Sequence, residues 1–224
     1  MPSVKIKKHA PDNDMTPFVD VAFLILSFFM LATKFKPEEP VEVTTPNSVS
    51  SQALPEKDAF MVSIDKEGRV FVSMDNPQAR QLLISNLNTT RNLGLTPAEI
   101  KNFINAPSVG VPFNQLKSLL SLDPEAESTK NALKAQPGIP CADSTGGELY
   151  YWVRDALVAY SGKKLNLLIK SDNNTKYPAF KDVLNAFKKN DQNKFLLVTS
   201  PEDAPIGTAL YETRQKQIGG GGEK

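Results

Sequence analysis

The run of apolar residues over positions 16–35 constrains this chain more than any other feature of its sequence. From Pro17 to Phe35 it is interrupted only by one serine, one threonine, one lysine and one acid, Asp20. About 20 apolar residues suffice to cross the hydrocarbon core of a bilayer as a helix. An aspartate there costs roughly 2.5–3.5 kcal/mol on insertion scales, so an acid kept inside a span indicates a function. We therefore predict a single N-terminal transmembrane helix over residues 16–35, with a functional carboxyl at Asp20.

Two residues mark the start of this helix. Thr16 is a suitable N-cap, and Pro17 at the first helical position loses nothing by lacking an N–H. Asp20 then lies about one turn inside the helix. Polar groups inside a span need protein or water around them, so partner helices are expected; alternatively, Asp20 reaches a nearby interface. Helical spacing places on one face Thr16, Asp20, Phe23, Leu24, Ser27 and Leu31.

Residues 1–15 form a short arm before the span. A secretory signal peptide would start similarly, but its apolar core is usually about 7–15 residues long and is followed by a small-residue cleavage site. This run is longer, contains an acid and is followed by Lys34 and Lys36. We therefore expect an uncleaved anchor with a cytoplasmic N-terminus, because basic residues favour that side. The basic or titratable residues of the arm are Lys5, Lys7, Lys8 and His9.

Composition excludes several classes of function. Lys+Arg 26 against Asp+Glu 25 leaves no basic excess for nucleic acid. His9 is the sole histidine and no nucleophile or metal motif accompanies it, so histidine-based zinc sites and Ser-His-Asp catalysis are not expected. Cys141 is the sole cysteine, which favours a free thiol over a disulfide between two copies. We expect a protein that is not an enzyme and holds no cofactor or metal.

The helix start also carries a family resemblance. Asn13-Asp-Met-Thr-Pro-Phe-Val-Asp20-Val-Ala-Phe-Leu-Ile-Leu26 resembles the N-terminal motif of the ExbD/TolR family, N-x-T-P-F/L-V/I-D-V followed by one apolar span. The resemblance implies a proton-driven motor subunit in the inner membrane of Gram-negative bacteria, with Asp20 carrying the proton. It implies an ExbB/TolQ-like multi-span partner, a homodimer, and a TonB/TolA-like protein that is energised for transport across the outer membrane. TolR-like members are thought to bind the cell wall, so peptidoglycan binding is the alternative role.

Elementary electrostatics supports the same role for Asp20. Apolar surroundings favour the neutral form of a carboxyl, so a change of surroundings can load or release a proton. One charge crossing 100 mV yields about 2.3 kcal/mol, enough to bias a rotation or a two-state rearrangement. The proton would then be the coupling ion. Ser27 is either a polar group along the proton path or a small residue for helix packing.

Two segments outside the predicted domain are rich in loop-forming residues. Residues 36–58 form an extended periplasmic linker rich in Pro, Glu, Ser and Thr, which we interpret as a passive spacer. The alternative is that Val41–Pro46 adds as a strand to a sheet edge. Residues 201–224, which end in Gly219-Gly-Gly-Gly222-Glu-Lys, are predicted to be a flexible tail.

Residues 59–200 predict a small α/β (α+β) periplasmic domain with a mixed sheet. The first two strands are joined through Gly68 and form a hairpin signal. The last two strands enclose a helix, which implies parallel pairing. This last part resembles the family's second half, with Asp172 and Tyr177 at its characteristic positions. We expect strands over 60–65, 69–73, 165–170 and 195–199, and helices over 77–87, 148–160 and 179–189.

Residues 90–147 depart from the short family pattern and form a predicted helical insertion. Thr96-Pro-Ala-Glu99 is a capping box that opens a helix to about Ile104. Further helices are expected over 112–121 and 124–135. The acids at 123, 125 and 127 are spaced somewhat like calcium ligands, but Pro124 favours a helix start. After the insertion, the aromatic cluster Tyr150-Tyr151-Trp152 favours core packing over stacking on a sugar.

Overall fold

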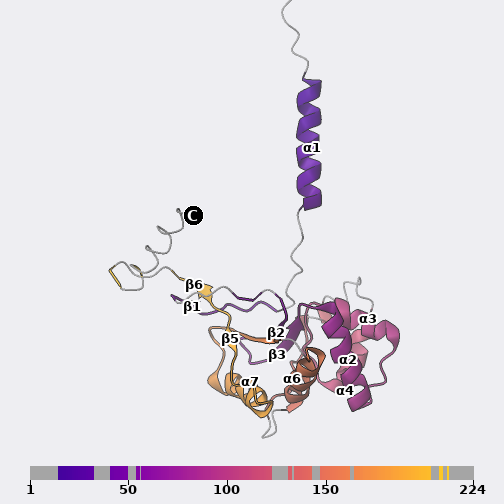
Figure 1. Ribbon diagram of the computed structural model, residues 1–224, viewed down its shortest axis with the longest axis vertical. Helices are drawn as coiled ribbons and strands as arrows, with labels where there is room; N and C mark the ends of the chain where they lie inside the picture. Colours follow the sequence, from indigo (N-terminus) through magenta and orange to yellow (C-terminus); the bar gives the residue numbers. More distant parts are fainter. Residues whose placement is uncertain are drawn as a thin grey trace, which may run out of the picture. The chain divides into compact units, whose positions relative to one another are not determined.

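The computed structural model describes residues 15–32, 41–49, 54–55, 57–122, 131–132, 134–142, 147–161, 164–202, 207–208 and 211. They belong to two units, Met1–Glu38 and Glu39–Lys224. The first unit contains helix α1 (Thr16–Ala32), and the second contains the other described elements (Figure 1). Apart from Met15, the predicted N-terminal arm lies outside the described residues, as does most of the predicted tail.

The surface of helix α1 is mostly apolar, and Thr16, Asp20 and Ser27 are its polar residues. Every residue from Met15 to Ala32 is exposed. The helix has 17 residues, whereas the predicted span covered residues 16–35, of which 33–35 lie outside the described part. Among the described residues, no helix combines the length and the apolar character needed to cross a membrane. The transmembrane span therefore stays a prediction.

A mixed sheet with strand order β3-β2-β4-β5 organises the second unit. Strands β2 (Ala59–Ile64) and β3 (Val70–Met74) form the predicted antiparallel hairpin, whose turn contains Gly68 at φ +85°. Strand β4 (Asn166–Ser171) pairs in parallel with both β2 and β5 (Leu196–Leu197). The predicted mixed α/β architecture is confirmed, although β5 is shorter than the predicted strand over 195–199.

Two helices of this unit begin at side-chain caps: Asn76 precedes α2 (Pro77–Arg91), and Thr96 precedes α3 (Pro97–Asn105). Helix α2 runs past the predicted end near Leu87, because the polar residues that follow stay helical until Asn92 adopts a left-handed φ of +51°. The predicted capping box is present at the start of α3. The N–H of Thr96 donates to the side chain of Glu99, and the N–H of Glu99 donates to the hydroxyl of Thr96. The described helices are α2 (Pro77–Arg91), α3 (Pro97–Asn105), α4 (Phe113–Leu120), α6 (Gly147–Ala159) and α7 (Tyr177–Lys189).

Most of the third helix predicted in the insertion, 124–135, lies outside the described residues. Of this segment, residues 131–132 and 134 are helical. Asp123, Glu125 and Glu127 are also outside the described part, so the choice between helix capping and calcium binding stays a prediction.

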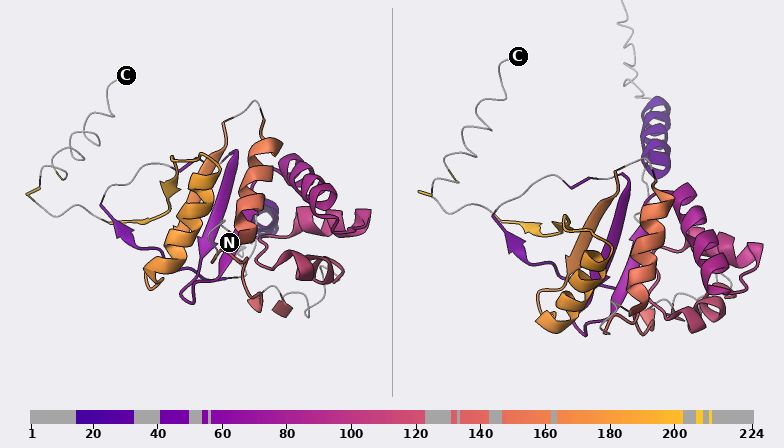
Figure 2. Two further views of the ribbon diagram at one scale, coloured as in Figure 1. Left: turned by 90° about the horizontal axis from the view of Figure 1, so that it is seen from below. Right: turned by 60° about the horizontal axis from the view of Figure 1, so that its bottom comes forward.

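Helices α6 and α7 cover one face of the sheet, and α2 packs beside α6 (Figure 2). Alternate residues of β2 point to this face, and Phe60, Val62 and Ile64 are completely buried there. Helix α6 lies between α2 and α7 and therefore closes the core over the centre of the sheet.

The core continues into the helical insertion through Trp152. This side chain of α6 is fully buried and stacks between the rings of Phe103 in α3 and Phe113 in α4, with centroids 5.8 and 5.7 Å away. Stacking of Trp152 on a sugar is therefore excluded, and the predicted core packing is confirmed for this residue. The insertion shares one hydrophobic core with the rest of the unit.

The insertion also covers the outer edge of β3. Val109 forms an antiparallel bridge with Val72, and the N–H of Ile139 donates to the carbonyl of Val70 at 2.8 Å. Gly110 allows this close approach, because a Cβ there would lie 2.1 Å from the ring of Phe71. Cys141 follows as a buried thiol, as the sequence favours, and its Sγ donates to the carbonyl of Ile139 at 3.2 Å. The edge of β3 is thus unavailable for pairing with another chain over these residues.

The linker interpretation as a passive spacer is wrong for residues 44–48. Strand β1 (Asn47–Ser48) pairs in parallel with β6 (Ser200–Pro201), forming a two-stranded sheet. The alternative prediction was a strand over Val41–Pro46. The observed strand follows Pro46, so this prediction is wrong about the position of the strand. Pro201 and Glu202, predicted to belong to the flexible tail, take part in this pairing.

We predict that Trp152→Ala lowers the free energy of unfolding by about 3–5 kcal/mol, because it opens a cavity between the helix that covers the sheet and the helices of the insertion. Val158→Ala on the same helix is the control: Val158 is 54% exposed, so its loss should change stability by less than about 0.5 kcal/mol. Urea unfolding of the full-length protein, followed by circular dichroism, measures both. A loss below about 1 kcal/mol for Trp152→Ala would show that the insertion packs independently.

Candidate functional site

The predicted helix start lies within one residue of the observed one. Thr16 is the first helical residue of α1, and the carbonyl of Met15 accepts from the N–H groups of Phe18 and Val19, each at 3.1 Å. Accepting the first intrahelical bond is the position of an N-cap, so the cap falls on Met15 instead of Thr16. Pro17 still lies in the first turn, where its missing N–H is not needed.

Asp20 lies one turn into this helix, on a surface that is otherwise apolar. Thr16, Pro17, Val19, Asp20 and Phe23 line one hollow on the helix surface. Within the described part of the chain, the carboxylate of Asp20 has no ion-pair or hydrogen-bond partner. The site therefore consists of one titratable group that α1 presents without any compensating cation.

Ser27 does not join this hollow. Its hydroxyl donates to the carbonyl of Leu24 in the same helix at 2.9 Å. A hydroxyl that is bonded to its own backbone can sit on a helix surface without another partner. Of the four predicted site residues, Thr16, Pro17 and Asp20 lie together, and Ser27 lies on the same helix but makes a local bond.

A second carboxylate, Asp172, attaches the linker to the folded domain. It follows β4 and is 7% exposed. Its Oδ2 accepts from the N–H of Thr44 at 2.8 Å, and its Oδ1 accepts from the N–H of Asn174 at 2.9 Å. The N–H of Asn173 in turn donates to the carbonyl of Thr44 at 2.8 Å. Both the N–H and the carbonyl of Thr44 are thus hydrogen-bonded to the segment that follows β4.

Three further hydrogen bonds continue this attachment toward β6. The hydroxyl groups of Thr45 and Ser200 are 2.7 Å apart. The N–H of Ser200 donates to the carbonyl of Pro46, and the N–H of Glu202 donates to that of Ser48, each at 3.0 Å. Most of these bonds use backbone groups. They therefore require an extended linker backbone but place few demands on the identity of its side chains.

The electrostatics of Asp172 follow from these contacts. Hydrogen bonds from the backbone of Asn174 and Thr44 stabilise the charged form and lower the pKa of Asp172 below its ordinary value, although burial acts in the opposite direction. Docking of the linker is therefore favoured where Asp172 is ionised. Sequence reasoning placed Asp172 at a family position but missed its partner, because Thr44 is separated from it by 128 residues.

Tyr177, the other family position, is the first residue of α7 and is 69% exposed. Its ring lies on the surface, so it does not contribute to the core of the second unit. The structure therefore separates the two positions: Asp172 holds the linker, and Tyr177 faces outward.

We predict that Asp172→Asn releases residues 44–48, because a neutral amide accepts hydrogen bonds from the Thr44 and Asn174 amides less strongly than a carboxylate does. Hydrogen exchange of the Thr44, Ser200 and Glu202 amides should accelerate by about tenfold or more, while the amides of β2 stay protected. Asp191→Asn, at an exposed residue after α7, is the matched control. Unchanged protection at Thr44 would show that the other bonds hold the linker without the charge.

The pH dependence of docking has a definite sign. Because the folded-state pKa of Asp172 is lowered, the contribution of its charge is complete above the ordinary value of about 3.9 and is lost as pH falls through the folded value. We predict that the amide resonance of Thr44 is constant above about pH 5 and shifts toward an undocked position only below about pH 4. A transition at neutral pH would contradict this assignment.

Comparison with known proteins identifies the chain through most of its length. Residues 7–202 match the family described as Biopolymer transport protein ExbD/TolR. Comparisons with curated proteins and with solved structures gave no match. The matched range includes the helix start with Asp20, the linker, the whole described sheet and the insertion. The chain therefore belongs to the ExbD/TolR family of biopolymer transport proteins.

Proposed function

We propose that this protein is the proton-carrying subunit of an energy-transducing motor in a bacterial inner membrane. The observation that supports the proposal most directly is Asp20, a single uncompensated carboxyl on an exposed apolar helix of a biopolymer transport protein. A helix that is apolar all round is stable only inside protein or lipid. Proteins of this family are typically associated with the inner membrane.

The membrane placement of α1 is part of this proposal. At about 1.5 Å per residue its 17 residues measure roughly 26 Å, a few ångström less than a hydrocarbon core of about 30 Å. Bilayers adapt to such a difference by local thinning. In this arrangement the arm over 1–15 is cytoplasmic, and the unit that begins at Glu39 is periplasmic.

The proposed mechanism uses the two charge states of Asp20. The neutral carboxyl is stable against an apolar wall, whereas the carboxylate needs polar groups or water. Partner helices of an ExbB/TolQ-like multi-span protein, with which the family generally works, would supply both surroundings in turn. Each proton that crosses 100 mV provides about 2.3 kcal/mol to bias the movement. The proton is the coupling ion, and the proposed role is not enzymatic.

The second unit is proposed to transmit this movement to a TonB/TolA-like protein for transport across the outer membrane. The core that the sheet shares with the insertion would let this unit move as one rigid body. Two copies of this chain in one motor would place two Asp20 carboxyls at equivalent positions, which is why a homodimer is part of the proposal.

A TolR-like role in binding peptidoglycan is the second candidate. A cleft of about 470 Å³ lies between the hairpin turn, the loop around Cys141 and the start of α7. Its rim carries both signs of charge, Lys66 and Lys176 against Glu67 and Asp182. Such a rim suits peptide stems that bear ammonium and carboxylate groups. Retention of the full-length protein on purified cell walls, and its loss in Lys66→Glu/Lys176→Glu, would support this role.

We predict that Asp20→Asn abolishes energised uptake in cells while leaving the protein level and the assembly with partner subunits unchanged. The amide keeps the size of the side chain but cannot exchange a proton in this pH range. Ser27→Ala is the matched control in the same helix, and it should retain uptake because the hydroxyl bonds only to its own backbone. Uptake of a labelled substrate in a strain lacking the native protein measures both. Normal uptake by Asp20→Asn would end the proton-carrier proposal.

A further inference from the structure

Three strands of the second unit run in parallel and begin at the same edge of the sheet, and one lysine stands two residues before each of them. Lys57 precedes β2, Lys164 precedes β4 and Lys194 precedes β5. Neighbouring strands are about 4.8 Å apart, so these three positions are distributed over roughly 10 Å. The side-chain amide of Asn166, at the start of β4, donates to the carbonyl of Lys57 at 3.2 Å and holds the first two segments together.

Helix α7 ends at the same edge, because it returns the chain from the end of β4 to the start of β5. The rings of Phe187, near the end of α7, and Phe195, just before β5, have centroids 6.2 Å apart. The last two residues of α7 are lysines, so they lie close to the lysine that precedes β5. We call five exposed side chains the lysine edge: Lys57, Lys164, Lys188, Lys189 and Lys194.

No lysine of this edge forms an ion pair with a carboxylate of the described residues. The opposite edge of the sheet differs. There the Nζ of Lys66 lies 3.6 Å from a carboxylate oxygen of Glu67, and the Nε of Arg69 lies 2.6 Å from one of Asp65. Exposed ammonium groups without such partners repel one another and attract a partner of opposite charge.

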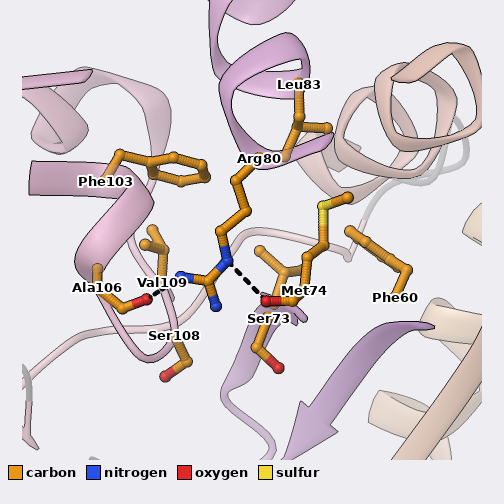
Figure 3. Close-up of a pocket in the computed structure, with 10 residues that line it drawn as sticks. Phe60, Ser73, Met74, Arg80, Leu83, Phe103, Ala106, Ser108 and Val109 are labelled. Carbon is orange, nitrogen blue, oxygen red and sulfur yellow. Dashed lines mark hydrogen bonds between the residues drawn. The ribbon is translucent and has the colours of Figure 1, made fainter. Parts of the chain in front are cut away.

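One acid at this edge, Asp75, is offset by a cation from the interior. Asp75 follows β3, and its Oδ1 accepts from the N–H of Ala59 at 3.0 Å. The charge of Arg80 in α2 attracts Asp75. Arg80 itself is committed to backbone carbonyls, because its Nε donates to Met74 and its Nη1 to Ala106, each at 2.6 Å (Figure 3). Asp75 and Arg80 together therefore add no net charge to the edge.

The remaining acids leave the lysine edge with a positive surplus. Five lysines stand against Asp58 and Asp191, which leaves three positive charges. Outside the described residues, the sequence adds one acid and one lysine, Glu56 and Lys163, whose charges cancel. The whole chain has a net charge of only +1, so positive charge is concentrated at this edge.

We infer that the lysine edge binds the anionic headgroups of phospholipids, given the proposed placement of α1 in a bilayer, on which this inference rests. Exposed ammonium groups on flexible stems suit a surface of many phosphates better than one enclosed anion. Lysine is depleted in interfaces between proteins, which disfavours a polypeptide partner. Peptide stems of the cell wall carry both signs of charge, whereas the phosphates of anionic lipids carry the one sign that matches this edge.

The expected strength follows from the number of lysines. Each lysine near an anionic bilayer strengthens binding by about fivefold, and the attraction decays within a Debye length of about 8 Å at physiological ionic strength. Several lysines on one edge can act together on a flat surface, because their positions before adjacent strands hold them side by side. The binding should therefore depend on anionic lipid and on salt.

The test measures how fast each lysine of the full-length protein is acetylated by N-hydroxysuccinimidyl acetate, with mass spectrometry as the readout. The protein is placed in nanodiscs of phosphatidylcholine alone, or of equal parts phosphatidylcholine and phosphatidylglycerol. Acetylation of the lysine edge should slow by about fivefold or more in the anionic discs and recover at high salt. Lys66 and Lys176, which line the cleft beside the hairpin turn, are internal controls and should react equally in both discs. Equal reactivity of the lysine edge in both discs, or protection that persists at high salt, would overturn the inference.

A triple variant tests whether the lysines act together. Lys57→Gln/Lys164→Gln/Lys194→Gln removes three charges and keeps Lys188 and Lys189 as reporters. The loss should weaken the lipid contact by about a hundredfold and return acetylation of both reporters in anionic discs to the rate in neutral discs. Lys66→Gln/Lys176→Gln is the matched control and should leave the protection unchanged. Reporters that stay protected in the triple variant would contradict binding by the lysine edge.

Two further arms separate this inference from its alternatives. Co-purification of the protein with neutral discs reports the insertion of α1 independently of the lysine edge. A protein that fails to co-purify would refute the membrane placement, and the same lysines would then be measured with anionic vesicles added. Purified cell walls added to neutral discs test the other polyanion. Protection by cell walls without protection by anionic lipid would assign the edge to peptidoglycan and overturn the inference.

Discussion

The second unit depends on the main-chain pairing of β2 with neighbours on both sides. This strand pairs antiparallel with β3 and parallel with β4, and its three inward side chains are completely buried. A strand buried in this way has a fixed register, because a shift by one residue would turn Phe60, Val62 and Ile64 away from the helices. The hairpin, the crossover through α7 and the position of α6 all follow from this register. Trp152 then extends the same core to α3 and α4.

The insertion and the linker each add main-chain pairing beyond the four-stranded sheet of the second unit. On the β3 side, the insertion contributes Val109 and Ile139 to the edge and supplies the carbonyls that hold Arg80. The linker instead forms a separate two-stranded sheet with β6, next to the hydrogen bonds that it makes with Asp172 and Ser200. Unpaired strand edges readily pair with other chains, so covering them limits where a partner can attach.

The two units divide the chemistry between them. In α1 the informative group is one carboxyl without a partner, which suits a residue whose charge is to change. In the second unit the informative groups are fixed: Asp172 accepts backbone N–H groups from two segments, and Arg80 donates to three carbonyls. A charge that is saturated with hydrogen bonds positions other elements, whereas an unsaturated one is available for transfer or binding. Asp20 belongs to the unsaturated kind.

The sequence by itself determined several features that depend on neighbouring residues. The apolar run with Asp20, the hairpin at Gly68 and the capping box of Thr96 and Glu99 could be predicted because periodicity, turns and caps act over a few residues. The family followed from the motif around Asp20. Only the tertiary structure decided that Thr44 meets Asp172, that Val109 covers the edge of β3, and that Arg80 donates to the carbonyls of β3 and α3. These contacts join residues far apart in the chain through backbone groups, which carry no side-chain signature, and they exist only once the shared core has set the distances.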